Sequence, residues 1–553
     1  MKKHYSILTL LLIILIMVCQ NVEAGTPQNV DPAKTNADLL RDSGPLNPPS
    51  ILVAGADVVM KPTTVNQTDV KIATAFNGWM YSVFNSHDGV NDSIFVMHSR
   101  NHGISWNKLI SAAGYNYSSD IIVCGNDTNA LDLYVSSILY DATTGMHTFW
   151  VNKNNALTGA LIDVPITESS MDTIYDGALA HDFQHPAAGA SPYSVEAVYS
   201  KHGASEDSVI AILSMDGGAT FTDRKVVDIN SDQFGKVAVC YGYSPDDANG
   251  KYFVAYEQHL VGAKYGHIKV SRTDAQVSDP FTTPIYVDSL FTIVAQWANF
   301  GNNPSISVQN SATSNSSNGL TAVVMWESFY NGTPDYDCVG AFSLMAGASS
   351  GTWQHCYVDY AITDTYQPDI CFDETNNKFL VTYWDSTNNR LRYYSQGFNM
   401  PTPIAWTLGT LQYNDRVGTM LNPYPQIAFD PHFGTADFVW NEIRSSVRTA
   451  LFDAEFSVVG IQDNSLQKSS SLHHYPNPAN DYTNIRFYLE KSQPVSLEIY
   501  DVVGKRIGLI DQQIMASGSH QLKIDVSQWP AGYYSVSYKT NDEQSNQKLL
   551  IIH

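Results

Sequence analysis

Charge is scarce in this sequence, and positive charge is the scarcest. Only 15% of the 553 residues are charged, and 31 Lys and Arg stand against 54 Asp and Glu, so the formal net charge is −23. Nucleic acids and anionic membranes attract proteins through Lys and Arg side chains that replace their counterions. We therefore expect no nucleic-acid partner and no binding to anionic membranes.

Cysteine is also rare, and its spacing carries no metal signature. Five of the six cysteines follow Cys19, and this odd number excludes a fully paired intramolecular set. The sequence leaves open whether Cys338 pairs with Cys356. No Cys or His cluster has zinc spacing, and no phosphate-binding loop, calcium loop or nucleophile elbow occurs. We expect no metal and no cofactor.

No apolar run is long enough to cross a bilayer as a helix, which takes about 20 residues. The run from Ile7 to Val18 follows Lys2 and Lys3 and precedes the small residue Ala24, an order typical of a secretory signal peptide. We predict a signal peptide at residues 1–24 and a leader segment at 25–50. No other stretch predicts a transmembrane segment.

Long helical periods are missing as well, and short β-rich runs recur instead throughout residues 51–459. One pattern returns: an inner strand, a turn, a second strand that ends in an aromatic and a polar residue, then two further strands. Seven such units, of which the first three are ragged, predict an all-β chain folded as a β-propeller, with seven blades favoured and six or eight left open. The strand at Ile51 to Met60 precedes the first unit and is expected to complete the last blade, which removes exposed strand edges.

Two turns share a pattern of hydroxyl, acid or amide, glycine, hydroxyl and aromatic residues. One turn contains Ser214, Asp216, Gly218, Thr220 and Phe221, and the other contains Ser99, Asn101, Gly103, Ser105 and Trp106. Both resemble the Asp-box of sialidase-like β-propellers. In that family the boxes are structural and lie on the face opposite the active site, so the resemblance implies architecture and assigns no catalytic role.

Sialidases also need an Arg-Ile-Pro-like motif near the start and three arginines that hold a carboxylate. Arg41 is the only arginine before residue 100, and no such motif surrounds it. We expect no sialidase activity, and the sequence names no catalytic residue. It leaves catalysis as such undecided, with a binding protein favoured over an enzyme.

The end of the chain carries four motifs in a fixed order: Tyr475-Pro476-Asn477-Pro478, the strand from Leu497 to Asp501 with its turn at Gly504, Trp529 to Tyr534, and the apolar strand Lys548 to Ile552. This order resembles the type A C-terminal sorting domain of type IX secretion cargo in the Bacteroidota. The resemblance implies a small β-sandwich at residues 473–553 that engages the type IX secretion machinery. Residues 460–472, with three consecutive serines, are expected to form a flexible linker.

The recurring aromatic–polar pairs are the candidate ligand-binding residues. Each lies where a second strand returns to the face that carries the blade-to-blade loops, so a rim of carboxylates and aromatic edges is one interpretation. The other is that the aromatics pack between blades and the acids cap turns. The candidates are Tyr256, Glu257, Trp326, Glu327, Trp384, Asp385, Trp440 and, after Asn441, Glu442.

Together these features predict a secreted or outer-surface propeller, exported by type IX secretion, that binds a glycan or protein ligand on its loop face. The alternative is a glycoside hydrolase or lyase on a divergent sialidase-like scaffold. That alternative requires carboxylates about 5 to 10 Å apart, a distance that sequence does not supply.

Overall fold

The computed structural model describes residues 57–551 with interruptions, and all of its regular elements are β-strands. The interruptions are residues 88–91, 104, 188, 246, 260–265, 275–278, 289–300, 315–319, 331–334, 345–352, 359–363, 399–406, 409–419, 455–472, 476–478, 490, 502–504, 517 and 541–543. The predicted signal peptide, leader and linker lie outside the described residues and stay predictions.

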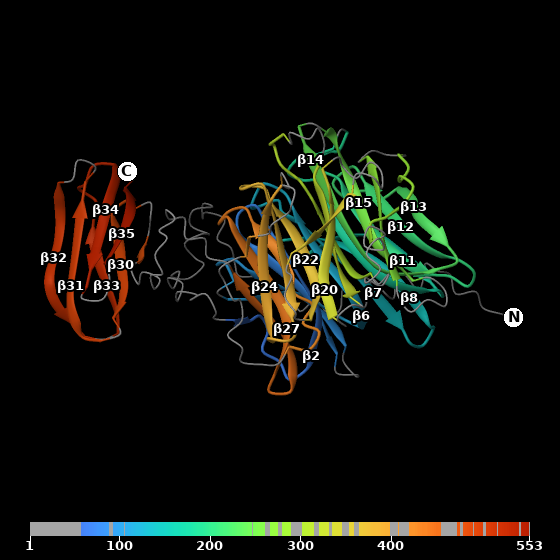
Figure 1. Cartoon of the computed structure of the whole chain (residues 1–553), viewed down its shortest axis with the longest axis horizontal. Coiled ribbons are helices and arrows are strands. Elements are labelled where there is room, and N and C mark those ends of the chain that lie inside the picture. Colours follow the sequence, from blue (N-terminus) through green and yellow to red (C-terminus); the bar gives the residue numbers. More distant parts are fainter. Residues whose placement is uncertain are drawn as a thin grey trace. The chain divides into compact units, whose positions relative to one another are not determined.

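Seven four-stranded antiparallel sheets form the first compact unit, Met1–Ser457, as the all-β propeller prediction required (Figure 1). We number these sheets as blades in chain order.
Blade one contains β2 (Asn66–Thr74), β3 (Met80–His87), β4 (Ser93–Ser99) and β5 (Asn107–Ala113). Blade two contains β6 (Tyr115–Cys124), β7 (Asp132–Asp141), β8 (Met146–Asn155) and β9 (Leu161–Ser170). Blade three contains β10 (Thr173–His181), β11 (Val195–His202), β12 (Asp207–Ser214) and β13 (Asp223–Asn230). Blade four contains β14 (Gln233–Ser244), β15 (Asp247–His259), β16 (Gly266–Asp274) and β17 (Ile285–Tyr286). Blade five contains β18 (Asn302–Val308), β19 (Ala322–Tyr330), β20 (Asp335–Ser343) and β21 (Trp353–Tyr357). Blade six contains β22 (Thr365–Asp373), β23 (Lys378–Asp385), β24 (Arg390–Gly397) and β25 (Thr407–Leu408). Blade seven contains β26 (Gln426–Asp430), β27 (Thr435–Arg444), β28 (Val447–Ala454) and the early strand β1 (Val58–Val59).

The innermost strands contact one another in sequence from β2 to β26, and β26 contacts β2 again, so the blades form a closed ring. The strand expected at Ile51 to Met60 is present as β1, which pairs with β28 through Val58 and Phe452 and through Val59 and Leu451. Seven sheets are consistent with the seven units of the sequence. Middle strands such as β19 are covered on both faces by neighbouring blades, which explains why they read as continuous apolar runs.

Each first strand of blades one to six changes register close to its starting end, as a β-bulge does. In blade seven, β26 starts only after Tyr424. This end of the ring also carries the blade-to-blade connections, and we call it the loop face. Because a bulge re-aims side chains and leaves backbone groups unpaired, the bulges determine what the loop face presents.

The second compact unit, Val458–His553, contains two packed sheets, as the predicted C-terminal β-sandwich does (Figure 1). One sheet joins β29 (His473–Tyr475), β30 (Tyr482–Leu489) and β33 (Gly518–Asp525). The other joins β32 (Arg506–Met515), β31 (Gln493–Tyr500), β34 (Gly532–Lys539) and β35 (Gln544–Ile551). Their facing side chains, including Val495, Leu497 and Val536, form one buried core.

The two turns with the shared motif have the same hydrogen bonds. The Ser214 hydroxyl donates to Asp216 Oδ1 at 2.8 Å and accepts from Gly218 N at 2.9 Å, and Thr220 N donates to Asp216 Oδ1 at 2.8 Å. Ser99, Asn101, Gly103 and Ser105 repeat these three bonds at 2.9, 2.9 and 3.0 Å. The bonds explain why both turns need this order of residues, and the Asp-box assignment itself stays a prediction.

Cys338 and Cys356, whose pairing the sequence left open, are both buried thiols, so among the described residues this disulfide is not formed. No helix in the described part of the chain is long and apolar enough to cross a membrane.

We predict that Gly103→Ala weakens the contact between blades one and seven. Gly103 has a φ of 76°, and an added Cβ would lie 1.8 Å from Cε1 of Phe452 on β28. Gly434→Ala is a matched control, because Gly434 has a φ of 68° with no atom within 4 Å of an added Cβ. Thermal unfolding should show a loss for Gly103→Ala that exceeds the control by about 1–3 kcal/mol, the usual cost of overpacking. Equal losses in the two variants would contradict the tight contact at Phe452.

Candidate functional site

One residue of each blade lies at or next to the bulge of its first strand on the loop face, and in blade seven it lies just before β26. These seven residues, which we call the mouth ring, are Asp69, Ser118, Asp176, Lys236, Asn303, Gln367 and Tyr424. Five of them, all but Asp176 and Lys236, have a positive φ between 46° and 55°. Left-handed backbone is uncommon for residues other than glycine and concentrates at functional sites. The mouth ring is therefore the first place to look for a site.

Polar residues of the second strands bond the bulge of the next blade. Glu257 Oε1 accepts from Asn303 N at 2.6 Å, and Glu327 Oε1 accepts from Gln367 N at 2.8 Å. Ser200 Oγ donates to Gly235 O at 2.7 Å, and Asn85 Oδ1 accepts from Ser119 Oγ at 3.1 Å. These bonds link blades one to two, three to four, four to five and five to six.

Acids of the first strands add bonds of the same kind. Asp176 Oδ2 accepts from Val237 N at 2.9 Å, and Asp369 Oδ2 accepts from Ile427 N at 2.8 Å. Burial raises the pKa of Asp176, Asp369 and Glu327, although these bonds favour the charged form. The acids near the mouth thus serve to satisfy backbone amides, which would otherwise be buried without partners.

Lys236 crosses the mouth toward the opposite side of the ring. Its Nζ lies 4.4 Å from the centroid of the Tyr424 ring, so blade four contacts blade seven through a cation–π pair. Burial opposes the charge of Lys236, but Asp176, Tyr424, Glu257 and Asp69 surround it and hold its pKa above the ordinary value. Lys71 also interacts with Asp176 and Asp369. The mouth therefore combines two lysines with a group of acids.

The contact between blade seven and blade one differs from the other contacts between blades. Here Asn441 occupies the place of Glu327: its N donates to the O of Pro423, which precedes Tyr424, as Glu327 pairs with Asn302, which precedes Asn303. Asn441 is 1% exposed, and among the described residues neither its amide oxygen nor its amide nitrogen has a hydrogen-bond partner. The side chain that would link this pair of blades is left with unused bonding capacity.

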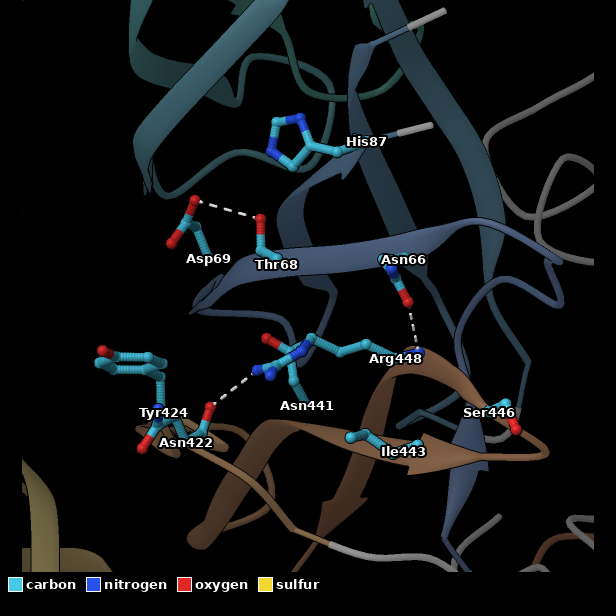
Figure 2. Close-up of a pocket in the computed structure, with 10 residues that line it drawn as sticks. All are labelled: Asn66, Thr68, Asp69, His87, Asn422, Tyr424, Asn441, Ile443, Ser446 and Arg448. Atoms are coloured by element: carbon cyan, nitrogen blue, oxygen red, sulfur yellow. Dashed lines mark hydrogen bonds between the residues drawn. The ribbon is translucent and has the colours of Figure 1, made fainter. Parts of the chain in front are cut away.

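A pocket with a volume of 570 Å³ opens at this place on the loop face (Figure 2). Its size lies within the range of about 300–1,000 Å³ that is usual for small-molecule sites. The lining residues are Asn66, Thr68, Asp69, His87, Asn422, Tyr424, Asn441, Ile443, Ser446 and Arg448.

Two opposite charges face each other across this pocket, on Asp69 and Arg448. Arg448 Nη1 donates to Asn422 O at 3.0 Å (Figure 2). Asp69 Oδ2 accepts from Asn85 Nδ2 at 3.1 Å. Asp69, Asn422, Tyr424 and Ser446 all have a positive φ. The pocket is thus polar, close to neutral, and built from strained backbone.

The eight candidate residues predicted from the sequence are buried, and none of them lines the pocket. All are at most 8% exposed, and the aromatics Trp326 and Trp440 are in the core between blades. Tyr256, Glu257, Trp326 and Glu327 lie at the predicted end of the second strand, where the two acids bond the next blade. Their role in ligand binding stays a prediction.

Blade six is shifted by one residue relative to the repeat that the sequence suggested. Thr382 pairs with Asp369 as Met325 pairs with Ser305, so Trp384 occupies the place of Glu327. Asp385 instead accepts from Nε of Arg390 and of Arg392, both at 3.1 Å, at a turn. Glu442 also lies beside an arginine: it accepts from Trp440 Nε1 at 3.3 Å and lies 3.5 Å from Arg444 Nε.

Sequence reasoning missed the residues that line the pocket. His87, Asn422, Tyr424 and Arg448 belong to no repeated motif, and their proximity results from closure of the ring between the two ends of the propeller. Asn422, two residues before Tyr424, belongs to a residue type that tolerates left-handed backbone, and Pro423 and Pro425 flank Tyr424. Within the described residues, no group of three or more His, Cys, Asp or Glu side chains is placed to hold a metal.

We predict that Glu257→Gln destabilises the propeller by about 1–3 kcal/mol, because Glu257 accepts backbone N–H groups with both carboxylate oxygens and an amide accepts with one. Glu196→Gln is the matched control. Glu196 is equally buried, its oxygens have no hydrogen-bond partner among the described residues, and burial raises its pKa to about 8.

The control variant Glu196→Gln should be as stable as the wild type at low pH and more stable than the wild type at pH 8. The folded protein keeps Glu196 protonated where the unfolded chain ionises it, so wild-type stability falls as the pH rises from about 4.5 toward 8, and Gln removes that loss. Urea unfolding of the three proteins across this pH range tests both statements. Equal stability of Glu257→Gln and wild type would show that the hydrogen bonds of Glu257 do not stabilise the contact between blades four and five.

Comparison with known families identifies the end of the chain. Residues 473–552 match the secretion system C-terminal sorting domain. This domain directs export by type IX secretion to the cell surface or beyond, and it implies an interaction with that machinery. No curated protein matches the chain.

Several solved structures resemble the chain at low identity. A polysaccharide lyase, the PL25 ulvan lyase, is 9% identical with a TM-score of 0.42 and covers 72% of this chain and 95% of its own. PorZ, a surface component of the type IX secretion system of Porphyromonas gingivalis, is 11% identical with a TM-score of 0.39 and covers 87% and 59%. The intramolecular trans-sialidase of Ruminococcus gnavus is 8% identical with a TM-score of 0.37 and covers 74% and 97%. Similarity at this level assigns no function.

Proposed function

We propose that this exported β-propeller binds a glycan in the pocket between blades seven and one. The observation that carries the proposal is Asn441, a buried amide in the pocket lining whose donor and acceptor have no partner among the described residues. A buried polar group without a partner costs stability, so it calls for an explanation. Both amide atoms are closed to solvent in the described protein. In this proposal a movement of the side chain toward the pocket presents them to a sugar hydroxyl, which both donates and accepts hydrogen bonds and can satisfy both ends of the amide.

The rest of the pocket supports a small neutral ligand over a protein surface. The volume of 570 Å³ suits a few sugar rings, and the charges of Asp69 and Arg448 oppose each other. Tyr424 adds an aromatic ring, and Asn66, Thr68 and Ser446 add polar side chains. Pockets of this kind combine an apolar surface with a small number of placed polar groups. In this proposal Glu257 and Glu327 act indirectly, by holding the mouth ring in place.

A glycoside hydrolase or lyase is the second candidate, and one observation favours it. His87, Tyr424 and Arg448 line the same pocket, and these groups can transfer a proton and hold a carboxylate. A hydrolase, however, requires two carboxylates about 5 to 10 Å apart. Asp69 is the only carboxylate among the lining residues that the structure describes. Release of reducing ends or of unsaturated uronates from a bound polysaccharide would favour the enzyme.

We predict that Asn441→Leu lowers glycan affinity at least tenfold, a change of about 1.4 kcal/mol, without loss of stability. Leucine keeps the side-chain volume and removes an amide that has no partner in the described protein. Isothermal titration with a polysaccharide that the wild type retains on a glycan array measures affinity, and thermal unfolding measures stability.

Asn85→Leu is the control at the same place in blade one. Asn85 bonds Asp69 and Ser119, so this variant should lose stability where Asn441→Leu does not. Unchanged affinity in a folded Asn441→Leu protein would refute the pocket as the glycan site. A wild type that retains no glycan at all would refute the proposed function.

We predict that removal of residues 473–553 leaves the propeller folded and retains it in the periplasm. The two units have separate cores, so the sheets up to Ala454 keep their contacts when the sorting domain is absent. Cell fractionation with immunoblotting gives the location, and thermal unfolding of the purified truncated chain gives its fold. Normal appearance of the truncated protein in the medium or on the surface would show that another segment directs export.

A further inference from the structure

We infer that the ligand is a neutral polysaccharide chain, which extends from the pocket outward across the loop face of blade two. The inference rests on the proposed function, because the pocket supplies one end of the path. An aromatic strip supplies the rest, and it consists of His87, Tyr115, Tyr140 and His147.

The four rings of this strip follow one another without interruption. His87 lines the pocket (Figure 2). Its ring centroid lies 5.0 Å from that of Tyr115. Tyr115 and Tyr140 are 6.5 Å apart, and Tyr140 and His147 are 4.8 Å apart. Tyr115, Tyr140 and His147 are also directly paired across β6, β7 and β8, so the sheet itself fixes their order.

One ring of the strip, Tyr115, is exposed, and the other three are half-buried. Tyr117 lies beside the strip, and its hydroxyl contacts His147 Nδ1 at 2.6 Å and donates to Ile174 O at 2.5 Å. Tyr115 is nevertheless 47% exposed. Exposed aromatic side chains in fixed positions offer a large contact area at little cost in conformational entropy, which is why they concentrate at binding surfaces.

The chemistry of the strip selects the ligand class. Aromatic faces contact the C–H faces of sugar rings, while phenol and imidazole groups bond hydroxyls. None of the four residues is Lys or Arg, so an anionic polymer would find no counter-charge on them. A cationic peptide would need free carboxylates. The carboxylate of Asp92 lies 3.5 Å from His87 Nδ1, and Glu257 and Asp176 already accept hydrogen bonds from backbone amides, so these acids disfavour such a ligand.

The test uses the full chain and oligosaccharides of glucan, xylan, mannan and arabinan, from the monosaccharide to the hexasaccharide, in isothermal titration. For the series that binds, affinity should rise at least about tenfold from the disaccharide to the hexasaccharide. Tyr115→Ala should abolish that gain and leave the affinity for the disaccharide unchanged, because the shortest ligands occupy the pocket alone. Tyr115→Phe keeps the ring and should keep most of the gain.

Ile162→Ala is the surface control, since Ile162 is 54% exposed on the outer strand β9 of the same blade. It should bind every length as the wild type does. Equal affinity for all lengths, or a Tyr115→Ala loss that is the same for short and long ligands, would overturn the chain inference while the glycan pocket stands. No binding of any of these neutral series by a wild type that retains another glycan would overturn the inference alone. A wild type that retains no glycan at all would overturn the proposed function and, with it, the inference.

Discussion

The bonds that satisfy the bulged inner strands are the constraint on which the rest of this propeller depends. A bulge releases backbone N–H groups at the crowded centre of the ring, and buried donors without partners are costly. The structure meets that need from the preceding blade, with Asp176, Glu257, Glu327 and Asp369 as acceptors. Each such bond fixes the distance between two blades. The acids that look like a reactive rim in the sequence are therefore chiefly part of the frame.

The last contact around the ring joins blades seven and one, the two ends of the propeller, and it uses other bonds than those of Glu257 and Glu327. β1 contributes only Val58 and Val59 to blade seven, and side-chain contacts complete the join: Arg444 bonds Asp57, Lys71 bonds Gln426, and Gln67 Oε1 accepts from Ala450 N at 2.7 Å. Asn441 stands at the place from which a side chain would bond the bulge of the next blade. Its amide makes no hydrogen bond among the described residues. The pocket lies at one of the contacts without this bond, and there the side chain at that place is an amide without a partner among the described residues.

This arrangement explains which features were predictable from the sequence. Strand runs and their repetition predict the propeller and its closing strand, because burial between blades leaves a direct imprint on residue type. The aromatic–polar pairs are visible for the same reason. In blade six, however, Tyr383 and Trp384 are both aromatic, so the sequence pattern points to Trp384 and Asp385, one residue beyond the equivalent place. The pocket was not predictable. It depends on the φ angles of Asp69, Asn422 and Tyr424, and on a contact between residues more than 350 positions apart, such as Lys71 and Gln426.

The cost of the pocket argues that it has a use. Left-handed backbone at a residue such as Tyr424 costs about 1–3 kcal/mol, and a buried amide without partners costs a further 1–3 kcal/mol or so. The orphan amide is not required to close the ring, since Glu257 and Glu327 close other contacts between blades without one. Left-handed backbone recurs in the mouth ring at Ser118, Asn303 and Gln367, so the amide of Asn441 is the feature that needs an explanation at this contact. A ligand whose hydroxyls pair with Asn441 would recover part of this free energy on binding, which links the unpaired amide to the proposed function.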